Sequence, residues 1–154
     1  MELIERETFY VCGYAVETTA AQNDNDVSGL YNDFFDKGKE AILLRLHGCK
    51  KGYYGLSWYA QGHEKYCYLL GVEVGKGNEP PENAVIKELE KTAFAVAYYP
   101  SDKNIIEAWN EFFYTDIPNA GYAPNEQYNL YFEYYPENAR GDYELWVPVM
   151  KAST

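Results

Sequence analysis

Hydrophobic and polar residues alternate along the first half of the chain in a way that predicts a strand, a helix and a pair of strands. Residues 9–18 are rich in β-branched and aromatic residues, which favour a strand. Apolar residues between positions 27 and 46 recur mostly at helical spacing, which predicts an amphipathic helix that is loosened near Gly38. Residues 53–60 and 65–74 are again β-rich and are separated by the short segment QGHE, so we expect them to form a hairpin.

The second half of the chain follows the same order. Residues 84–90 alternate apolar and polar side chains and predict a strand, and residues 94–100 predict another. A helix is expected next, with apolar residues at helical spacing: Ile105, Ile106, Trp109, Phe112 and Phe113. Residues 128–136 and 143–149 then predict a second hairpin.

Short polar residues are expected to cap the helices, and a loop is expected to separate the two halves. Asp24 or Asp26 is expected to cap the first helix, and Ser101 or Asp102 the second. The segment 75–84 combines Gly, Pro and Asn and is too short for a flexible interdomain linker, so we interpret it as a loop between two halves.

The two halves, about 9–74 and 84–150, therefore both have the order β-α-β-β. Neither half could bury a sheet face and a helix on its own. We predict an α+β fold in which the duplicated module forms one antiparallel sheet with two main helices, as a single domain over residues 1–154. A cleft at the join of the halves is a natural place for a ligand.

The segment YNLYFEYYPE carries a carboxylate in the middle of a predicted strand. Alternation places Tyr131, Glu133 and Tyr135 on one face of this strand. Glutamate is depleted in strands, so this face is either exposed to water or lines a pocket in which Glu133 has a task. Tyrosine hydroxyls on the same face could donate hydrogen bonds to it.

Composition favours a ligand pocket over a plain core. The chain of 154 residues contains 17 Tyr, 7 Phe and 3 Trp, and tyrosine suits surfaces that grip planar or amphipathic molecules. The net charge of −11 repels phosphate backbones, so we expect no direct binding of nucleic acid. The acidity favours cations as partners, although it also serves solubility alone.

Other classes of protein and site are disfavoured. Three cysteines without metal-ligand spacing, Cys12, Cys49 and Cys67, indicate reduced thiols, and the spacing of His47 and His63 matches no standard zinc site. We find no signal peptide and no stretch apolar enough to span a membrane, so we expect a cytoplasmic protein without metal or cofactor. Motifs of phosphate-binding loops and of serine hydrolases are missing.

A series of short segments between about residue 9 and residue 150 has a characteristic order and spacing: Tyr66–Val74, Pro80-Pro81, Ala93–Val96, Ile106 with Trp109, Ile117–Asn119 with Gly121-Tyr122, Phe132–Tyr134 and Val147–Val149. In these segments the chain resembles the GyrI-like family, the effector-binding domain of bacterial transcription activators. This resemblance implies a duplicated β-α-β-β fold with an aromatic pocket between the modules. It also implies that Glu133, in its F-E-Y context, accepts cationic, planar, lipophilic compounds.

From the resemblance and the residues together we expect a small-molecule binding protein that acts in sensing, sequestration or protection. The residues expected to bind the ligand are Glu133, Tyr131, Trp109, Tyr68, Trp58, Tyr59, Phe112 and Tyr14. Trp109 could equally be core, and alternation lets only one of Trp58 and Tyr59 face the cleft. Two alternatives stay open: a hydrolase of reactive xenobiotics such as cyclopropane-bearing alkylators, with Glu133 as general base, and a gyrase-inhibitor-like module that binds a protein partner. Pairing of two copies as a homodimer is a further option.

Overall fold

A computed structural model describes residues 1–19, 21–59 and 65–153 and has an α+β fold. The strands are β1 (Glu2–Arg6), β2 (Phe9–Thr18), β3 (Tyr53–Tyr59), β4 (Tyr66–Val74), β5 (Val85–Leu89), β6 (Thr92–Tyr99), β7 (Tyr122–Pro124), β8 (Tyr131–Tyr135) and β9 (Tyr143–Lys151). The helices are α1 (Asn23–Asp36), α2 (Lys39–Leu43), α3 (Ile105–Glu111), a π-helical turn (Phe112–Asp116) and α4 (Ile117–Asn119). The segment QGHE, predicted to be a turn, lies outside the described residues. None of the described helices is long and apolar enough to cross a membrane.

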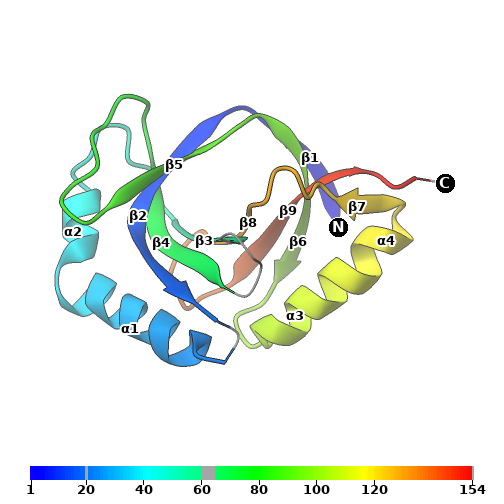
Figure 1. The fold of residues 1–154 in the computed structure, drawn as a ribbon, viewed down its shortest axis with the longest axis horizontal. Coiled ribbons are helices and arrows are strands. Elements are labelled where there is room, and N and C mark those ends of the chain that lie inside the picture. The colour runs from blue at the N-terminus through cyan, green and yellow to red at the C-terminus, as the bar shows by residue number, and fades with distance from the viewer. Residues whose placement is uncertain (20, 60–64, 154) are drawn as a thin grey trace.

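The strands form one antiparallel sheet in the order β1-β6-β9-β8-β3-β4-β2-β5, with β7 paired to β9. The predicted duplication is confirmed, because β2, α1–α2, β3 and β4 are matched by β6, α3, β8 and β9 on the other side of a central β3–β8 seam. The sheet curls, and both helical layers lie on its outer side (Figure 1).

The strand predicted at residues 84–90 is the edge strand β5, but the other edge strand and the pairing of both were not predicted. Residues 2–6 form β1, which pairs with β6 of the second module, while β5 pairs with β2 of the first module. Each edge strand therefore belongs, by sequence, to the module at the opposite end of the sheet. The turns β1–β2 and β5–β6 meet where Lys91 N donates to Thr8 Oγ1 at 3.1 Å, which joins the two ends of the curled sheet (Figure 1).

The first helical stretch breaks at the predicted place but begins differently. Gly38 has φ of 76°, a conformation that glycine adopts without strain, and it separates α1 from α2. The capping prediction was wrong, because Gln22 precedes α1 without a side-chain cap and Asp26 instead accepts from Thr18 Oγ1 at 2.8 Å. The Asp26 carboxylate is thus bonded to the hydroxyl of the buried Thr18 and does not cap the helix.

The second helix is capped by a residue that the sequence pattern did not single out. Asn104, rather than Ser101 or Asp102, accepts from the backbone N of Ile106 and of Glu107 at 2.9 and 3.1 Å. This satisfies two of the free N–H groups at the start of α3.

Buried side chains form cores on both sides of the sheet. The inner side, away from the helices, buries an aromatic cluster of which Phe132 is the centre, since its ring lies 5.3–6.1 Å from those of Tyr54, Trp146, Phe94 and Phe9. On the outer side, one cluster packs under α1 and α2 and another under α3. The alternation predicted for β8 is confirmed, because Phe132 faces the inner cluster while its neighbours Tyr131 and Tyr135 pack against α3.

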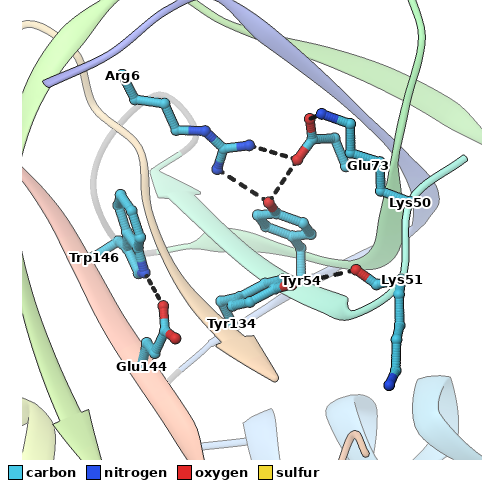
Figure 2. Close-up of polar contacts among 8 residues, drawn as sticks. All are labelled: Arg6, Lys50, Lys51, Tyr54, Glu73, Tyr134, Glu144 and Trp146. Carbon is cyan, nitrogen blue, oxygen red and sulfur yellow. Dashed lines mark hydrogen bonds and ion pairs between the residues drawn. The ribbon is translucent and has the colours of Figure 1, made fainter. Parts of the chain in front are cut away.

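An ion pair closes one end of the inner core and ties β1 to β4 (Figure 2). Arg6 Nη2 lies 2.5 Å from Glu73 Oε1, and Tyr54 donates to the same oxygen at 2.9 Å. Lys50 Nζ approaches the other carboxylate oxygen at 3.2 Å. Burial alone would raise the pKa of Glu73, but Arg6, Tyr54 and Lys50 together hold this pKa below its ordinary value.

Candidate ligand-binding site

Glu133 lies at the seam between the two modules. It occupies the middle of β8, directly opposite Gly55 on β3, and its side chain points to the outer side of the sheet, where α1 and α3 lie. Only 8% of the residue is exposed. The solvated strand face that the sequence left open is therefore excluded.

Gly55 makes room for this carboxylate. A Cβ atom at position 55 would lie 2.1 Å from the Tyr68 hydroxyl oxygen and 2.7 Å from Glu133 Oε1. Because position 55 has no side chain, Tyr68 from β4 can extend across β3 and contact Glu133 on β8.

We expect Gly55→Ala to disturb this meeting and to lower the free energy of unfolding by about 1–3 kcal/mol, the usual cost of overpacking a buried site. The contacting atoms are the ends of side chains, which can shift, so the protein should still fold. Urea unfolding measures the loss. Gly29→Ala is the control, because a Cβ there meets nothing within 4 Å and alanine suits the helix α1. An equal effect of the two substitutions would contradict the close approach at Gly55.

Polar groups of both modules surround the Glu133 carboxyl group. Tyr68 donates to Glu133 Oε1 at 2.5 Å, and the Tyr31 hydroxyl from α1 lies 3.1 Å from that of Tyr68. The Trp109 indole from α3 and the Tyr135 hydroxyl on β8 are near enough to lower the pKa of the carboxyl group. Among the described residues, no Lys, Arg or His forms an ion pair with it.

Burial without a cationic partner changes the acidity of the site. Burial raises the pKa of Glu133 above its ordinary value, and the hydrogen bond from Tyr68 and the nearby polar groups of Trp109 and Tyr135 only partly offset this rise. Burial and the nearby Glu133 likewise raise the pKa of Tyr68, so its hydroxyl stays protonated and able to donate. The carboxyl group can therefore exist as a neutral acid or as an anion that a cation would stabilise.

A cavity of about 280 Å³ opens beside this carboxyl group. Aromatic side chains make up most of its lining, which consists of Ser57, Trp58, Tyr59, Tyr66, Trp109, Asn110, Phe113, Tyr114 and Tyr131. The Tyr131 ring lies 5.6 Å from that of Trp109 and 6.4 Å from that of Tyr59, so side chains of both modules meet in the lining.

The cavity and Glu133 are neighbours on the same sheet face. Ser57 and Tyr131 pair across the seam two residues along from the pair Gly55 and Glu133, a distance of about 7 Å along a strand. Trp109 links the two places, because it lines the cavity and its indole lowers the pKa of the carboxyl group.

The structure brings together most of the residues expected at the site. Tyr131, Trp109, Trp58 and Tyr59 line the cavity, and Tyr68 contacts Glu133. Of the two residues that the sequence could not separate, Tyr59 has its ring among those of the outer face, near Tyr66 and Tyr131. Trp58 packs partly against the inner cluster, with Lys87 Nζ lying 4.2 Å from its ring centre, and contributes only at the cavity edge.

Glu133 and Tyr68 lie beside the cavity and not in its lining, and two other expected residues lie apart from both the cavity and Glu133. Phe112, in the π-helical turn, is wholly buried, and its neighbour Phe113 lines the cavity instead. Tyr14 packs against Phe34 beneath α1, with Lys39 Nζ above its ring. Helical spacing alone did not reveal which of two adjacent phenylalanines faces the sheet.

Tyr31 contacts the site but was not predicted to do so. In the sequence it is one apolar position of the first helix among several, and only the packing of α1 over β4 brings it to Tyr68. Within the described residues, no group of three or more His, Cys, Asp or Glu could hold a metal ion.

Three solved structures share this fold at low sequence identity. SAV2435, solved bound to tetraphenylphosphonium, aligns with a TM-score of 0.78 and 15% identity over 97% of this chain and 93% of its own. The integron cassette protein VCH_CASS2 of Vibrio cholerae aligns with a TM-score of 0.61 and 19% identity over 97% and 95% of the two chains. The C-terminal domain of EcmrR aligns with a TM-score of 0.66 and 10% identity over 98% and 97%.

Sequence comparison identifies the family. No curated protein sequence matches the chain significantly. The family model Cass2, described as integron-associated effector binding protein, matches residues 2–149. This match covers almost the whole chain, and the resemblance to effector-binding domains is confirmed. The chain belongs to the Cass2 family of integron-associated effector-binding proteins.

Proposed function

We propose that this protein binds cationic aromatic small molecules in the cavity at the module seam, with Glu133 as the charge-selecting residue. The observation that carries the proposal is a buried carboxyl group without a cationic partner beside a cavity lined by aromatic rings. Ring faces attract a cation with about 0.5–2 kcal/mol per contact, and a cation also neutralises a carboxylate that burial would otherwise destabilise. The biological role would be sensing, sequestration or protection from a toxic compound.

Two further features support this choice of ligand. The net charge of −11 attracts cations toward the protein and disfavours direct contact with nucleic acid. SAV2435, which shares the fold, has been solved with the aromatic cation tetraphenylphosphonium bound. We expect the same class of ligand here.

The test is titration of the protein with tetraphenylphosphonium, followed by quenching of tryptophan fluorescence. We expect saturable binding that Glu133→Gln weakens about tenfold, or about 1.4 kcal/mol. Binding of neutral triphenylphosphine oxide should change little, because the amide keeps the size of the side chain and removes only its charge.

Glu137→Gln is the matched control, because it removes the same charge from an exposed side chain that pairs with Lys51. It should leave the affinity for tetraphenylphosphonium unchanged. If the two variants weaken binding equally, or if the cation does not bind at all, Glu133 is not the charge-selecting residue.

A hydrolase of reactive xenobiotics is the second candidate, because a carboxyl group with a raised pKa suits a general acid or base. The same variant separates the two functions. An enzyme would retain binding of a reactive substrate in Glu133→Gln and lose product formation, whereas a binding protein would lose affinity and show no turnover with any substrate.

A further inference from the structure

A second cavity adjoins the one beside Glu133. It has a volume of about 340 Å³ and is lined by residues from β8, from β9 and from the loop between β7 and β8. Tyr59, Phe113 and Tyr131 line both cavities. Their side chains are neighbours, because the Tyr131 ring lies 6.4 Å from that of Tyr59 and 6.0 Å from that of Phe113. The two cavities therefore share an aromatic wall, which consists of these three side chains.

The two cavities together offer the room that either alone barely provides. Pockets that bind drug-sized molecules usually have volumes of about 300–1,000 Å³. The cavity beside Glu133 has about 280 Å³ and the second about 340 Å³, so a molecule that extends into both occupies a space well inside this range. Tyr59 in the shared wall is 40% exposed, so the wall reaches the surface, where a flexible chain can pass over it.

The second cavity differs in chemistry from the first. Apart from the shared wall, its apolar lining comes from Pro124, Leu130, Val147 and Pro148. Among the described residues that line it there is no Lys, Arg or His, so it has no group that would hold an anion. Apolar surface of this kind favours hydrocarbon, because burying a hydrocarbon chain removes it from water.

The polar residues of the second cavity do not change this preference. Asn129 Oδ1 accepts from the backbone N of Tyr59 at 3.3 Å, and Asn129 Nδ2 donates to the Tyr59 carbonyl oxygen at 3.1 Å. Both ends of this amide are thus used in fastening the loop to β3. Glu126 is exposed, so its charge stays hydrated and does not enter the cavity.

We propose that the second cavity binds the apolar chain of an amphipathic cation whose charged aromatic head lies in the cavity beside Glu133. This inference rests on the proposed function, because Glu133 and the first cavity hold the head group. The shared wall keeps the ligand in contact with aromatic rings along its whole path. The affinity for cations with the same head therefore rises with the length of the chain until the second cavity is filled.

The length dependence can be measured by titration calorimetry with methyltriphenylphosphonium and decyltriphenylphosphonium, which share a head group and differ only in the chain. We expect the decyl compound to bind wild-type protein at least tenfold more tightly, or about 1.4 kcal/mol. Glu133→Gln should weaken the binding of both cations by the same factor, because it acts on the head that they share.

Asn125→Trp fills the second cavity, because Asn125 lines this cavity and not the first. The loop is expected to keep its course, since the backbone N of Asn125 still donates to the Pro148 carbonyl oxygen at 2.7 Å. The variant should reduce the preference for the decyl compound to threefold or less and leave the affinity for methyltriphenylphosphonium unchanged.

Gln127→Trp is the matched control. It adds the same bulk two residues further along the same loop, at an exposed position that lines neither cavity. It should keep the wild-type preference for the long chain, which separates filling of the cavity from a general effect of a tryptophan on this loop.

A second measurement uses wild-type protein and so does not depend on the folding of a variant. NMR should show intermolecular contacts between the decyl chain and the methyl groups of Leu130, which lines only the second cavity. Leu70, buried under α1, should show none. Missing contacts to Leu130 overturn the inference, as does equal affinity for the two cations or an undiminished preference in folded Asn125→Trp.

The proposed function is judged separately. If methyltriphenylphosphonium binds and Glu133→Gln weakens this binding, the proposed function stands even where the chain has no effect. If neither cation binds, the proposed function fails and the inference fails with it.

Discussion

Arg6→Met is expected to lower the free energy of unfolding by about 3 kcal/mol, the lower end of the cost of removing one partner from a buried ion pair. The substitution leaves Glu73 buried at 7% exposure among the aromatic rings of the inner core. Tyr54 and the largely exposed Lys50 remain beside the carboxylate, which is why the full cost is not expected. Packing is also lost, because the guanidinium lies 3.5 Å from the centre of the Phe9 ring.

The double variant Arg6→Met/Glu73→Gln tells these contributions apart. It removes the stranded charge, so we expect it to recover part of the stability lost by Arg6→Met alone, as measured by urea unfolding at neutral pH. Lys91→Met is the control, because it breaks only ion pairs with exposed Glu5 and Glu7. A double variant less stable than Arg6→Met would show that charge burial is not the cause.

The pH dependence of stability should differ as well. The pKa of Glu73 is lowered on folding, so its contribution is present above the pKa of the unfolded chain and is lost as pH falls through the folded value. Arg6→Met should weaken this loss in acid. Glu133 acts in the opposite sense, because its pKa is raised on folding, and the stability that it contributes in acid is lost as pH rises through the folded value.

Phe132→Ala is expected to cost about 3–5 kcal/mol, as large-to-small changes of fully buried aromatic residues do. Phe132 is 1% exposed and stacks on Trp146 with the ring centres 5.4 Å apart. Its removal leaves a cavity that rings from four different strands cannot all move to fill. Phe132 also neighbours Glu133 on β8, so the same variant should loosen the floor of the proposed ligand site.

Chemical unfolding followed by circular dichroism measures the loss. Phe132→Leu, which retains more of the volume, should cost clearly less than Phe132→Ala. Tyr98→Ala serves as the control on a neighbouring part of the sheet, because Tyr98 is 52% exposed. Similar losses for the buried and the exposed position would argue against Phe132 as the centre of the inner core.

Much of the fold could be predicted because its signals are local. The alternation around Glu133 shows in the sequence, and the structure keeps it: Phe132 faces the inner core and Tyr131 the outer side. The break at Gly38 could be predicted for the same reason, since a residue without a Cβ adopts positive φ freely.

What the sequence did not reveal depends on contacts between distant segments. Residues 2–6 show no continuous apolar face, since most of this edge strand is exposed. Its partner β6 lies some ninety positions away in the sequence, so no local pattern predicts the pairing. Tyr31 looks like any apolar position of a helix until α1 packs over Tyr68. Asn104 caps α3 although two earlier polar residues were equally suited by type, since the choice depends on where the chain leaves β6.

The exchange of edge strands between the modules has a consequence for how the protein folds. β1 is synthesised first, yet Glu2 can pair with Val96 only after much of the second module has been synthesised. Likewise, the free edge of β2 can pair only after β5 has been synthesised. Long-range pairings of this kind slow folding, because distant segments must lose conformational entropy to meet before any contact stabilises them. Neither module is complete as a free-standing unit, and its exposed strand edge would be open to pairing with another chain. The two halves that line the cavity must therefore form together, so the proposed binding site appears in the same cooperative step as the fold.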